Sequence, residues 1–546
     1  MTHSEFRNPH SPFARLWPWL AAVFSGVLLT LCFPPYTQGW LAWIALTPLA
    51  AATFTPGGRW RRAALGYVAG LVFFSSTFWW LSTLADLYRN PWLLPLPVLL
   101  ALYMGLFFAF WAWFLGEILT AFDPDRSFTR SVRNLALGAL GASAWVAHEW
   151  VRERLFGGFG WNPLGVALHR DLAMIQIAEF TGTPGLSWLV AFANLMGVII
   201  VRRIVGELGP NFSRRIRWEF SLTMAVVALV FAFGIRRLLH PEVVEQKPLR
   251  VVAIQPNIPQ TDKFDREADE HVMTQIGQLT RLAILSQPPP QLVIWPESAV
   301  PRGVFSSEES FHFVMDLAKE GDFALLLGSV DFDPDKREDY NTALLLTGHG
   351  SGQQSYRKIH LVPFGEYLPL RPIFGGFLGE LVPGDFTAGS EYTMLHLPDP
   401  PAELGALVCF EDTLGDLTRH FVLNGAQVLV NVTNDGWFAK SPAAEQHLAN
   451  ATLRAVENRR PMVRCGNTGV TAQVLPNGDV EQWLPPFQQG FVAREVRVPM
   501  HPRITFYTRH GDWVSLVGIV FTLSALGTSV AVRRRANNAP GISPSN

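Results

Sequence analysis

Long apolar stretches alternate with short polar segments over the first 240 residues, and one more apolar stretch lies near the C-terminus. The stretches cover residues 16–34, 39–56, 63–85, 90–116, 134–147, 181–201, 220–235 and 513–532. A membrane-spanning helix needs about 20 apolar residues. Segments 134–147 and 220–235 reach that length only with their flanks. The pattern predicts eight transmembrane helices, seven before residue 241 and one after residue 505.

The composition supports a membrane protein. Only 16% of the 546 residues are charged and 49% are hydrophobic, whereas about 25% of an average soluble chain is charged. The net charge of −1 provides no bulk attraction to nucleic acid. Three cysteines, Cys32, Cys409 and Cys465, are too few for a disulfide framework.

Arginines are distributed unevenly over the two sets of loops that eight helices define. One set, together with both termini, carries arginines 7, 15, 59, 61, 62, 126, 130, 133, 202, 203, 214, 215, 217, 533, 534 and 535. The opposite set carries arginines 89, 152, 154, 170, 236 and 237. Because cytoplasmic loops carry the excess of positive charge, we expect cytoplasmic termini and an extracytoplasmic block at 241–505.

Two glycine-containing segments stand out in the membrane part. Gly66 and Gly70 form a GxxxG pair, which we interpret as a site of close helix packing. Residues 157–163 are too apolar for a simple solvated loop, so we expect a half-buried segment at the membrane surface.

The block at 241–505 has a different pattern. Short, nearly continuous apolar runs at 249–255, 291–295, 323–330, 404–409 and 426–432 are typical of strands buried on both faces. Helical patterns at 267–285 and 307–319 lie between them, and a glycine-containing turn at 348–350 separates two strands of a hairpin. We therefore expect three units: a transmembrane domain (1–240), an α/β domain (241–505), and a last helix with a cytoplasmic tail (506–546).

Chemically useful side chains follow three of the predicted strands. Glu297, Lys358 and Cys409 each end a strand, and functional residues gather at the carboxyl ends of strands in α/β sheets. We expect the three strands to belong to one sheet. A thiol, a carboxylate and an ammonium together favour nucleophilic catalysis. Spacing alone leaves open that Cys409 is an inert core residue and Glu297 a turn residue.

Longer motifs around these residues resemble a known family. Trp-Pro-Glu297, Arg-Lys358-x-His-Leu-Val-Pro-Phe-Gly-Glu366 and Val-Cys409-Phe-Glu411 are similar to the three motifs of the nitrilase superfamily. That resemblance implies a four-layer αββα sandwich with a Glu-Lys-Cys triad. The preceding helices and the motifs at 254–260, 434–438, 459–464 and 505–513 further resemble the apolipoprotein N-acyltransferase family of bacterial inner membranes.

The resemblance implies a role for each motif residue. Glu297 would be the general base, Lys358 the oxyanion stabiliser and Cys409 the nucleophile. Glu366 would hold the lysine, and Glu411 matches an acidic position after the cysteine. Four aromatic residues are candidates for substrate binding: Phe264, Phe410, Trp437 and Trp161. The family often has Tyr at position 410 and Trp near position 264, so the two phenylalanines keep an aromatic surface but lose a polar group.

The implied reaction transfers an acyl chain from a phospholipid, through a cysteine thioester, to the α-amino group of a diacylglyceryl-cysteine on an apolipoprotein. The enzyme would lie in the bacterial inner membrane with its catalytic domain on the periplasmic side. We expect no cofactor, because no phosphate-binding loop is present, and no metal, because His148-Glu149 lacks the second histidine of a zinc helix.

Two other functions compete with this interpretation. A membrane-tethered amidase of the nitrilase type would use water as the acceptor, and the triad alone does not exclude it, although eight helices are excessive for a tether. A transporter with a non-catalytic outer domain is the second alternative. The scarcity of ionisable residues within the apolar segments speaks against an ion pathway.

Overall fold

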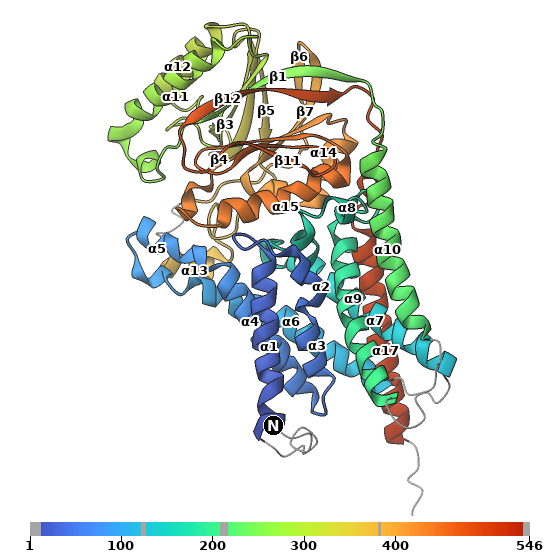
Figure 1. Ribbon diagram of the computed structural model, residues 1–546. Helices are drawn as coiled ribbons and strands as arrows, with labels where there is room; N and C mark the ends of the chain where they lie inside the picture. The colour runs from blue at the N-terminus through green and yellow to red at the C-terminus, as the bar shows by residue number, and fades with distance from the viewer. Residues whose placement is uncertain (1–11, 122–126, 208–216, 380–383, 539–546) are drawn as a thin grey trace, which may run out of the picture.

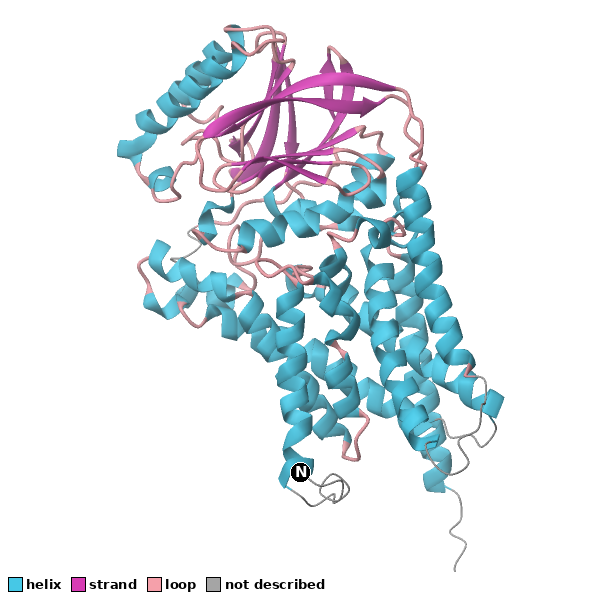
Figure 2. Ribbon diagram, in the orientation of Figure 1, coloured by secondary structure: helices cyan, strands magenta, loops and turns pink. Residues whose placement is uncertain are grey.

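The computed structural model describes residues 12–121, 127–207, 217–379 and 384–538. An elongated bundle of helices carries an α/β sandwich at one end (Figure 1). Colouring by secondary structure separates the two parts, and every strand within these described ranges lies in the sandwich (Figure 2). Helix α1 begins, and helix α17 ends, at the end of the bundle that lies away from the sandwich (Figure 1).

The helical part is built from the two ends of the chain. Its elements are α1 (Pro12–Cys32), η2 (Gly39–Leu41), α2 (Ala42–Ala45), α3 (Thr47–Thr53), α4 (Arg59–Thr77), η3 (Trp79–Thr83), α5 (Leu84–Leu87), η4 (Pro91–Leu93), α6 (Leu96–Ala121), α7 (Ser127–Arg152), η5 (Leu155–Gly157), η6 (Leu164–Leu168), α8 (Leu172–Ile175), α9 (Ala178–Glu207), α10 (Trp218–Leu239), α16 (Phe506–His510) and α17 (Trp513–Asn538).

Within the described residues, five helices are long and apolar enough to cross a membrane. A sixth is added if Arg59–Thr77 and Trp79–Leu87, which meet at 52°, form one bent span. All eight predicted segments are helical, but two of them fail this test. Residues Gly39–Thr53 are too short, and α7 is not among the helices that are apolar enough. Its charged groups, Arg130, Arg133, Glu149 and Arg152, lie toward its two ends.

The glycine pair of α4 confirms the predicted close packing. A Cβ added to Gly66 would lie 2.2 Å from the carbonyl oxygen of Phe108 on α6. A Cβ added to Gly70 would lie 2.8 Å from the Cα of Gly105, also on α6. Helices α4 and α6 therefore approach so closely that only glycine fits at both positions.

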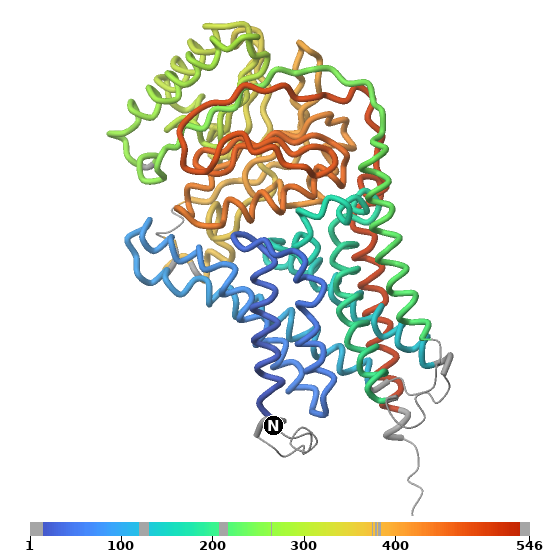
Figure 3. The backbone as a smooth tube through the Cα atoms, viewed as in Figure 1, coloured from blue at the N-terminus to red at the C-terminus, as the bar shows by residue number. Residues whose placement is uncertain are grey.

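Two six-stranded sheets form the sandwich. The first has the order β12-β1-β2-β3-β4-β5 and the second β11-β10-β9-β8-β7-β6. The strands are β1 (Gln246–Gln255), β2 (Leu292–Ile294), β3 (Ala324–Asp333), β4 (Glu338–Thr347), β5 (Gly352–Arg357), β6 (Leu395–Pro398), β7 (Pro401–Val408), β8 (Val428–Thr433), β9 (Met462–Gly466), β10 (Thr471–Val474), β11 (Val480–Leu484) and β12 (Gly490–Pro499). In Figure 3, the first and last strands of the domain, β1 and β12, run side by side, as their antiparallel pairing requires.

Each sheet has a parallel centre, β1-β2-β3 in the first and β7-β8-β9 in the second. Helices α11 (Asp269–Ile284) and α12 (Glu308–Lys319) cover the outer face of the first sheet, whereas α14 (Gly415–Leu423) and α15 (Ala443–Asn458) separate the second sheet from the helical bundle (Figure 1). A short helix, α13 (Arg371–Leu378), follows β5. Strand β8 is buried along its whole length, as its continuous apolar sequence predicts.

One sequence-based expectation about the sandwich is wrong. Glu297 follows β2 and Lys358 follows β5, both in the first sheet, but Cys409 follows β7 in the second. Apolar periodicity identifies a buried strand but carries no information about which sheet it joins. Because the two sheets pack face to face, strand ends from both of them meet at one edge of the sandwich.

Candidate active site

Cys409 occupies a sharp turn between a strand and a helix. It follows β7 directly and begins the short helix η9 (Cys409–Thr413), with a backbone φ of +51°. This left-handed conformation is uncommon for a residue other than glycine, and the side chain of Asn431 supports it by donating to the Cys409 carbonyl oxygen over 2.9 Å. Cys409 is partly exposed, whereas Cys32 and Cys465 are buried.

Lys358 lies between two carboxylates. Its Nζ is 2.8 Å from Glu366 Oε2, 2.9 Å from Glu366 Oε1 and 4.0 Å from Glu297 Oε1. The lysine side chain is only 1% exposed, so its charge depends on these partners. The structure thus brings Lys358, Glu366 and Glu297 together, as the resemblance implies.

Asn341 on β4 joins the two carboxylates. Its Nδ2 donates to Glu297 Oε1 and to Glu366 Oε1, each over 2.7 Å. The second oxygen of Glu297, Oε2, is buried and has no hydrogen-bond partner among the described residues. That oxygen is therefore available to accept a proton from a neighbouring group.

Burial and neighbouring charges together set the protonation states. Burial raises the pKa of Glu297 above its ordinary value, and the Lys358 ammonium only partly offsets this. Burial also raises the pKa of the Cys409 thiol, helped by the Glu297 carboxylate and opposed by Lys358. Burial alone would lower the pKa of Lys358, but the carboxylates of Glu366 and Glu297 raise it. The resting cysteine is therefore a thiol, and a base must remove its proton before it attacks.

Glu411 connects the lysine and cysteine segments. Its Oε1 accepts hydrogen bonds from the backbone N–H groups of Ile359 and His360 and from the Tyr356 hydroxyl, at 2.8, 3.0 and 2.8 Å. Its Oε2 accepts from the N–H of Val408 over 2.9 Å. Burial raises the pKa of Glu411 to about 7. One carboxylate therefore holds the end of β5 against the end of β7.

Four charged side chains form a closed ring beneath η9. His447 lies 2.7 Å from Asp412 and 2.8 Å from Asp435, and Arg464 pairs with the same two aspartates. All four are buried. Burial and Arg464 would lower the pKa of His447, but the two aspartates outweigh them and raise it. His447 Nε2 also lies 3.3 Å from the Cys409 carbonyl oxygen, so the ring supports the cysteine turn.

Aromatic side chains from both parts of the protein stack beside Cys409. The rings of Phe410, Trp161 and Phe159 are nearly parallel, with centroids 5.7 to 5.8 Å apart. The His360 ring stacks on Phe410 at 5.7 Å. Trp161 and Phe159 belong to the predicted half-buried segment 157–163, which reaches from α7 to the cysteine turn.

The other two aromatic candidates lie on short helices of the sandwich. Trp437 is half-buried in η10 (Asp435–Phe438), and the neighbouring Phe438 packs on Trp80 of the helical part at 4.4 Å. Phe264 ends η7 (Asp262–Phe264), and its side chain lies outside the described residues.

Gln446 of α15 contacts several segments of the helical part. Gln446 Oε1 accepts from the indole N–H groups of Trp80 and Trp161, each over 3.1 Å. Its Nε2 donates to the carbonyl oxygens of Pro34 and Thr77 at 2.9 and 3.2 Å. The residue that follows, His447, holds the cysteine turn. Helix α15 thus fixes Cys409 relative to the ends of α1 and α4.

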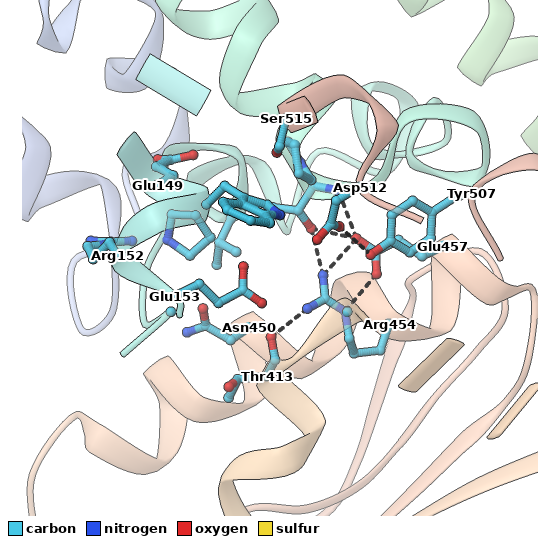
Figure 4. Close-up of a pocket in the computed structure, with 17 residues that line it drawn as sticks. Glu149, Arg152, Glu153, Thr413, Asn450, Arg454, Glu457, Tyr507, Asp512 and Ser515 are labelled. Atoms are coloured by element: carbon cyan, nitrogen blue, oxygen red, sulfur yellow. Dashed lines mark hydrogen bonds and ion pairs between the residues drawn. The ribbon is translucent and has the colours of Figure 1, made fainter. Parts of the chain in front are cut away.

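A polar pocket lies at the same junction (Figure 4). In it, Arg454 pairs with Glu457 at 2.7 Å and donates to the Thr413 carbonyl oxygen, while the Tyr507 hydroxyl donates to Asp512 over 3.1 Å. Among the residues that the structure describes, its walls include none of the predicted site residues. We interpret it as part of the contact between the two domains.

Sequence reasoning missed several residues of this site: Asn341, His447, Asp412, Asp435, Arg464 and Gln446. Asp435 lies in the motif at 434–438, Arg464 lies in the motif at 459–464, and Asp412 directly follows Glu411. Polar residues in buried segments are the signal that could have identified these three. Asn341 is likewise a polar residue in the buried part of its strand, β4. Their partners come from other elements, so no spacing within the chain reveals them.

Comparison with known proteins shows what the chain is similar to. Residues 25–196 match the apolipoprotein N-acyltransferase N-terminal domain, and residues 250–497 match the carbon-nitrogen hydrolase family. The apolipoprotein N-acyltransferase of Geobacter metallireducens is 35% identical over 98% of this chain and 99% of its own length. That of Brucella suis is 31% identical over 94% of this chain and 96% of its own.

Among solved structures, Nit3 of Saccharomyces cerevisiae, a member of branch 10 of the nitrilase superfamily, matches with a TM-score of 0.36 and 17% identity. The match covers 46% of this chain and 91% of Nit3.

Proposed function

The chain belongs to the apolipoprotein N-acyltransferase family, and from this premise we propose that Glu297, Lys358 and Cys409 transfer an acyl chain from a phospholipid to an apolipoprotein. The convergence of a carboxylate, an ammonium and the half-buried Cys409 at one edge of the sandwich carries this proposal. The acceptor is the α-amino group of a diacylglyceryl-cysteine.

The first half-reaction forms a thioester. Glu297 takes the proton of the Cys409 thiol, and the thiolate adds to the carbonyl carbon of the phospholipid ester. The Lys358 ammonium stabilises the oxyanion that develops. When the carbon–oxygen bond breaks, the leaving lysophospholipid takes the proton from Glu297. The free oxygen of Glu297 and its raised pKa, which burial causes, suit a group that accepts and returns a proton.

The second half-reaction forms an amide. The amine of the acceptor adds to the thioester carbon and gives its proton to Glu297. The carbon–sulfur bond breaks, and the thiolate regains the proton. The stacked rings of Phe410, Trp161 and Phe159 support a transferase rather than a hydrolase, because an apolar surface beside the thioester disfavours water and accommodates acyl chains.

The arrangement in the membrane belongs to the same proposal. We infer that all eight predicted segments cross or enter the membrane, with both termini cytoplasmic and the sandwich on the periplasmic side of the inner membrane. The arginine asymmetry supports this, as does the start of α1 and the end of α17 at the end of the bundle away from the sandwich. The proposal keeps the three units expected from the sequence, residues 1–240, 241–505 and 506–546. Reporter fusions at Gln246 and after residue 546 should report opposite sides of the membrane, and the same side for both would contradict the topology.

A transfer assay tests the reaction. The purified protein in mixed micelles receives phospholipid and a diacylglyceryl-cysteine peptide, and product is followed as amide or as free fatty acid. We expect amide, with ping-pong kinetics in the two substrates. Release of free fatty acid at a rate that the peptide does not change would favour the amidase-type hydrolase instead.

A further inference from the structure

A second lysine contacts the strand end that carries Glu297. Lys263 lies in η7, and its Nζ donates to the backbone carbonyl oxygens of Glu297 and Ser298, over 3.1 and 3.0 Å. It belongs to none of the three motifs. The contact is made to the main chain, so it fixes the position of the segment from which the carboxylate extends.

The backbone at this point is unusual and tightly enclosed. Ser298 has a φ of +47°, in the left-handed region. A Cβ added to Gly328 on β3 would lie 2.4 Å from the Cα of Glu297, so β3 packs directly against the same backbone. Lys263 holds the backbone of this turn from η7.

The segment that carries Lys263 is itself anchored. The side chain of Gln260 accepts a hydrogen bond from Asn434 Nδ2 over 2.7 Å. Asn467 both donates to and accepts from the backbone of Ile258, at 2.9 and 3.0 Å. The lysine is therefore presented from a fixed element.

The positive charge of Lys263 matters as well as its hydrogen bonds. Lys358 is 4.0 Å from Glu297 and 2.8 Å from Glu366, and Glu411 adds a third carboxylate to its surroundings. Without another cation, one ammonium and an ionisable thiol would face three acids in a low-dielectric site, where unbalanced charge is costly.

We propose that Lys263 is a positioning residue that holds the Glu297 turn and keeps the Glu297 carboxylate ionised at neutral pH. This rests on the proposed function of Glu297 as the general base. Burial lowers the pKa of Lys263 to about 8, while Glu297 opposes the change. The ammonium is therefore present near neutral pH, where Glu297 must be ionised to take the thiol proton.

The test compares variants that separate charge from hydrogen bonding. Lys263→Gln keeps N–H donors for the two carbonyl groups and loses the charge, and Lys263→Arg keeps both. Lys319→Gln removes a charge from an exposed side chain of α12 and serves as the matched control. The rate of acyl-adduct formation on Cys409 is measured with phospholipid alone, from about pH 5 to about pH 9. Thermal unfolding checks that each variant is folded.

We expect the acid limb of the Lys263→Gln profile to move to higher pH by about one unit, because loss of a nearby cation raises the pKa of a carboxylate. Its rate should be several-fold below wild type near pH 6 and equal to it near pH 9, and both Lys263→Arg and the control should follow wild type. An unchanged midpoint, or the same fold-loss at every pH, would overturn the inference. If the wild-type protein forms no adduct at any pH, the proposed function fails, and the inference fails with it.

Discussion

Two buried clusters of charged side chains adjoin Cys409, and their charges are compensated differently. In the ring of Asp412, His447, Asp435 and Arg464, every group contacts two groups of opposite charge. In the cluster around Lys358, two carboxylates share one ammonium at 2.8 and 4.0 Å. One oxygen of Glu297 there lacks a hydrogen-bond partner among the described residues.

The ring is suited to support the cysteine turn, whereas the cluster around Lys358 is suited to react. In a closed ring, the ion pairs offset the free-energy cost of removing the four charges from water, and they hold the side chains in one geometry. The ring is therefore suited to fix the turn that carries the Cys409 thiol. An incompletely paired cluster costs stability, but its free oxygen and raised pKa values allow proton transfer. We therefore expect changes in the two clusters to have opposite signatures, the first in stability and the second in activity.

The largest effect on activity should come from the incompletely paired cluster. Cys409→Ala removes the proposed nucleophile, and Glu297→Gln and Lys358→Met remove the proposed base and the proposed oxyanion stabiliser. Each should reduce acyl transfer by at least about 100-fold, the usual cost of losing an oxyanion donor. Cys409→Ala and Glu297→Gln should do so without lowering the unfolding temperature, whereas Lys358→Met should also lower it, because Glu366 then loses its buried partner. Residues that act as one unit are not additive, so a Glu297→Gln/Lys358→Met double variant should be little worse than either single one. Losses that multiply would indicate independent roles.

The largest effect on stability should come from the ring. Arg464→Met leaves Asp412 and Asp435 without their guanidinium, and breaking a buried pair in this way costs about 3–5 kcal/mol. Denaturant unfolding in detergent measures it. Arg281→Met is the matched control, because the exposed Arg281–Glu320 pair is worth about 0–1 kcal/mol. If the two variants lose the same stability, the distinction between the clusters disappears.

Glu366 tests whether the partner of Lys358 matters through its charge. Glu366→Gln keeps the shape but weakens the 2.8 Å ion pair, so we expect kcat to fall at least tenfold, or about 1.4 kcal/mol, with little change in KM or stability. Unchanged activity would show that the charge of Glu366 is irrelevant. The isosteric change Glu308→Gln, at a side chain that is 91% exposed, is the control.

Sequence patterns predicted most of the fold and part of this site. The apolar runs located the buried strands, and the resemblance located Glu297, Lys358, Glu366, Glu411 and Cys409. The pairing of strands into two sheets was not predictable, because β2 and β7 are both buried and mainly apolar and differ in their tertiary partners. Asn341 and His447 were not predicted for the same reason, because their hydrogen-bond and ion-pair partners lie on elements that are distant in the sequence.

The aromatic stack should have a moderate effect. Phe410→Ala removes the ring that contacts both Trp161 and Phe159, and such contacts are worth about 0.5–1.5 kcal/mol. We expect KM for the phospholipid to rise up to about tenfold while the pH profile stays unchanged. Phe410→Tyr, which restores the more usual residue of the family, should remain within about twofold of wild type. A loss in kcat with unchanged KM would place Phe410 in the chemical step instead.

The smallest effect concerns pH and stability. The pKa of His447 is raised in the folded protein by Asp412 and Asp435, although burial and Arg464 oppose this. Its protonation therefore contributes stability that is fully present below the ordinary histidine pKa of 6.5 and is lost as pH rises through the folded value. The unfolding temperature should fall between about pH 6 and about pH 9, and less steeply in His447→Asn. Equal slopes would contradict the protonated ring.

The central claim is that Cys409 carries the acyl chain. Intact-protein mass spectrometry after incubation with phospholipid alone should show the gain of one acyl chain, removed by neutral hydroxylamine and discharged as an amide by a diacylglyceryl-cysteine peptide. Peptide mapping should place the adduct on Cys409, and Cys409→Ala should gain nothing. An adduct on Cys32 or Cys465, or transfer to the peptide by the Cys409→Ala protein, would contradict the account.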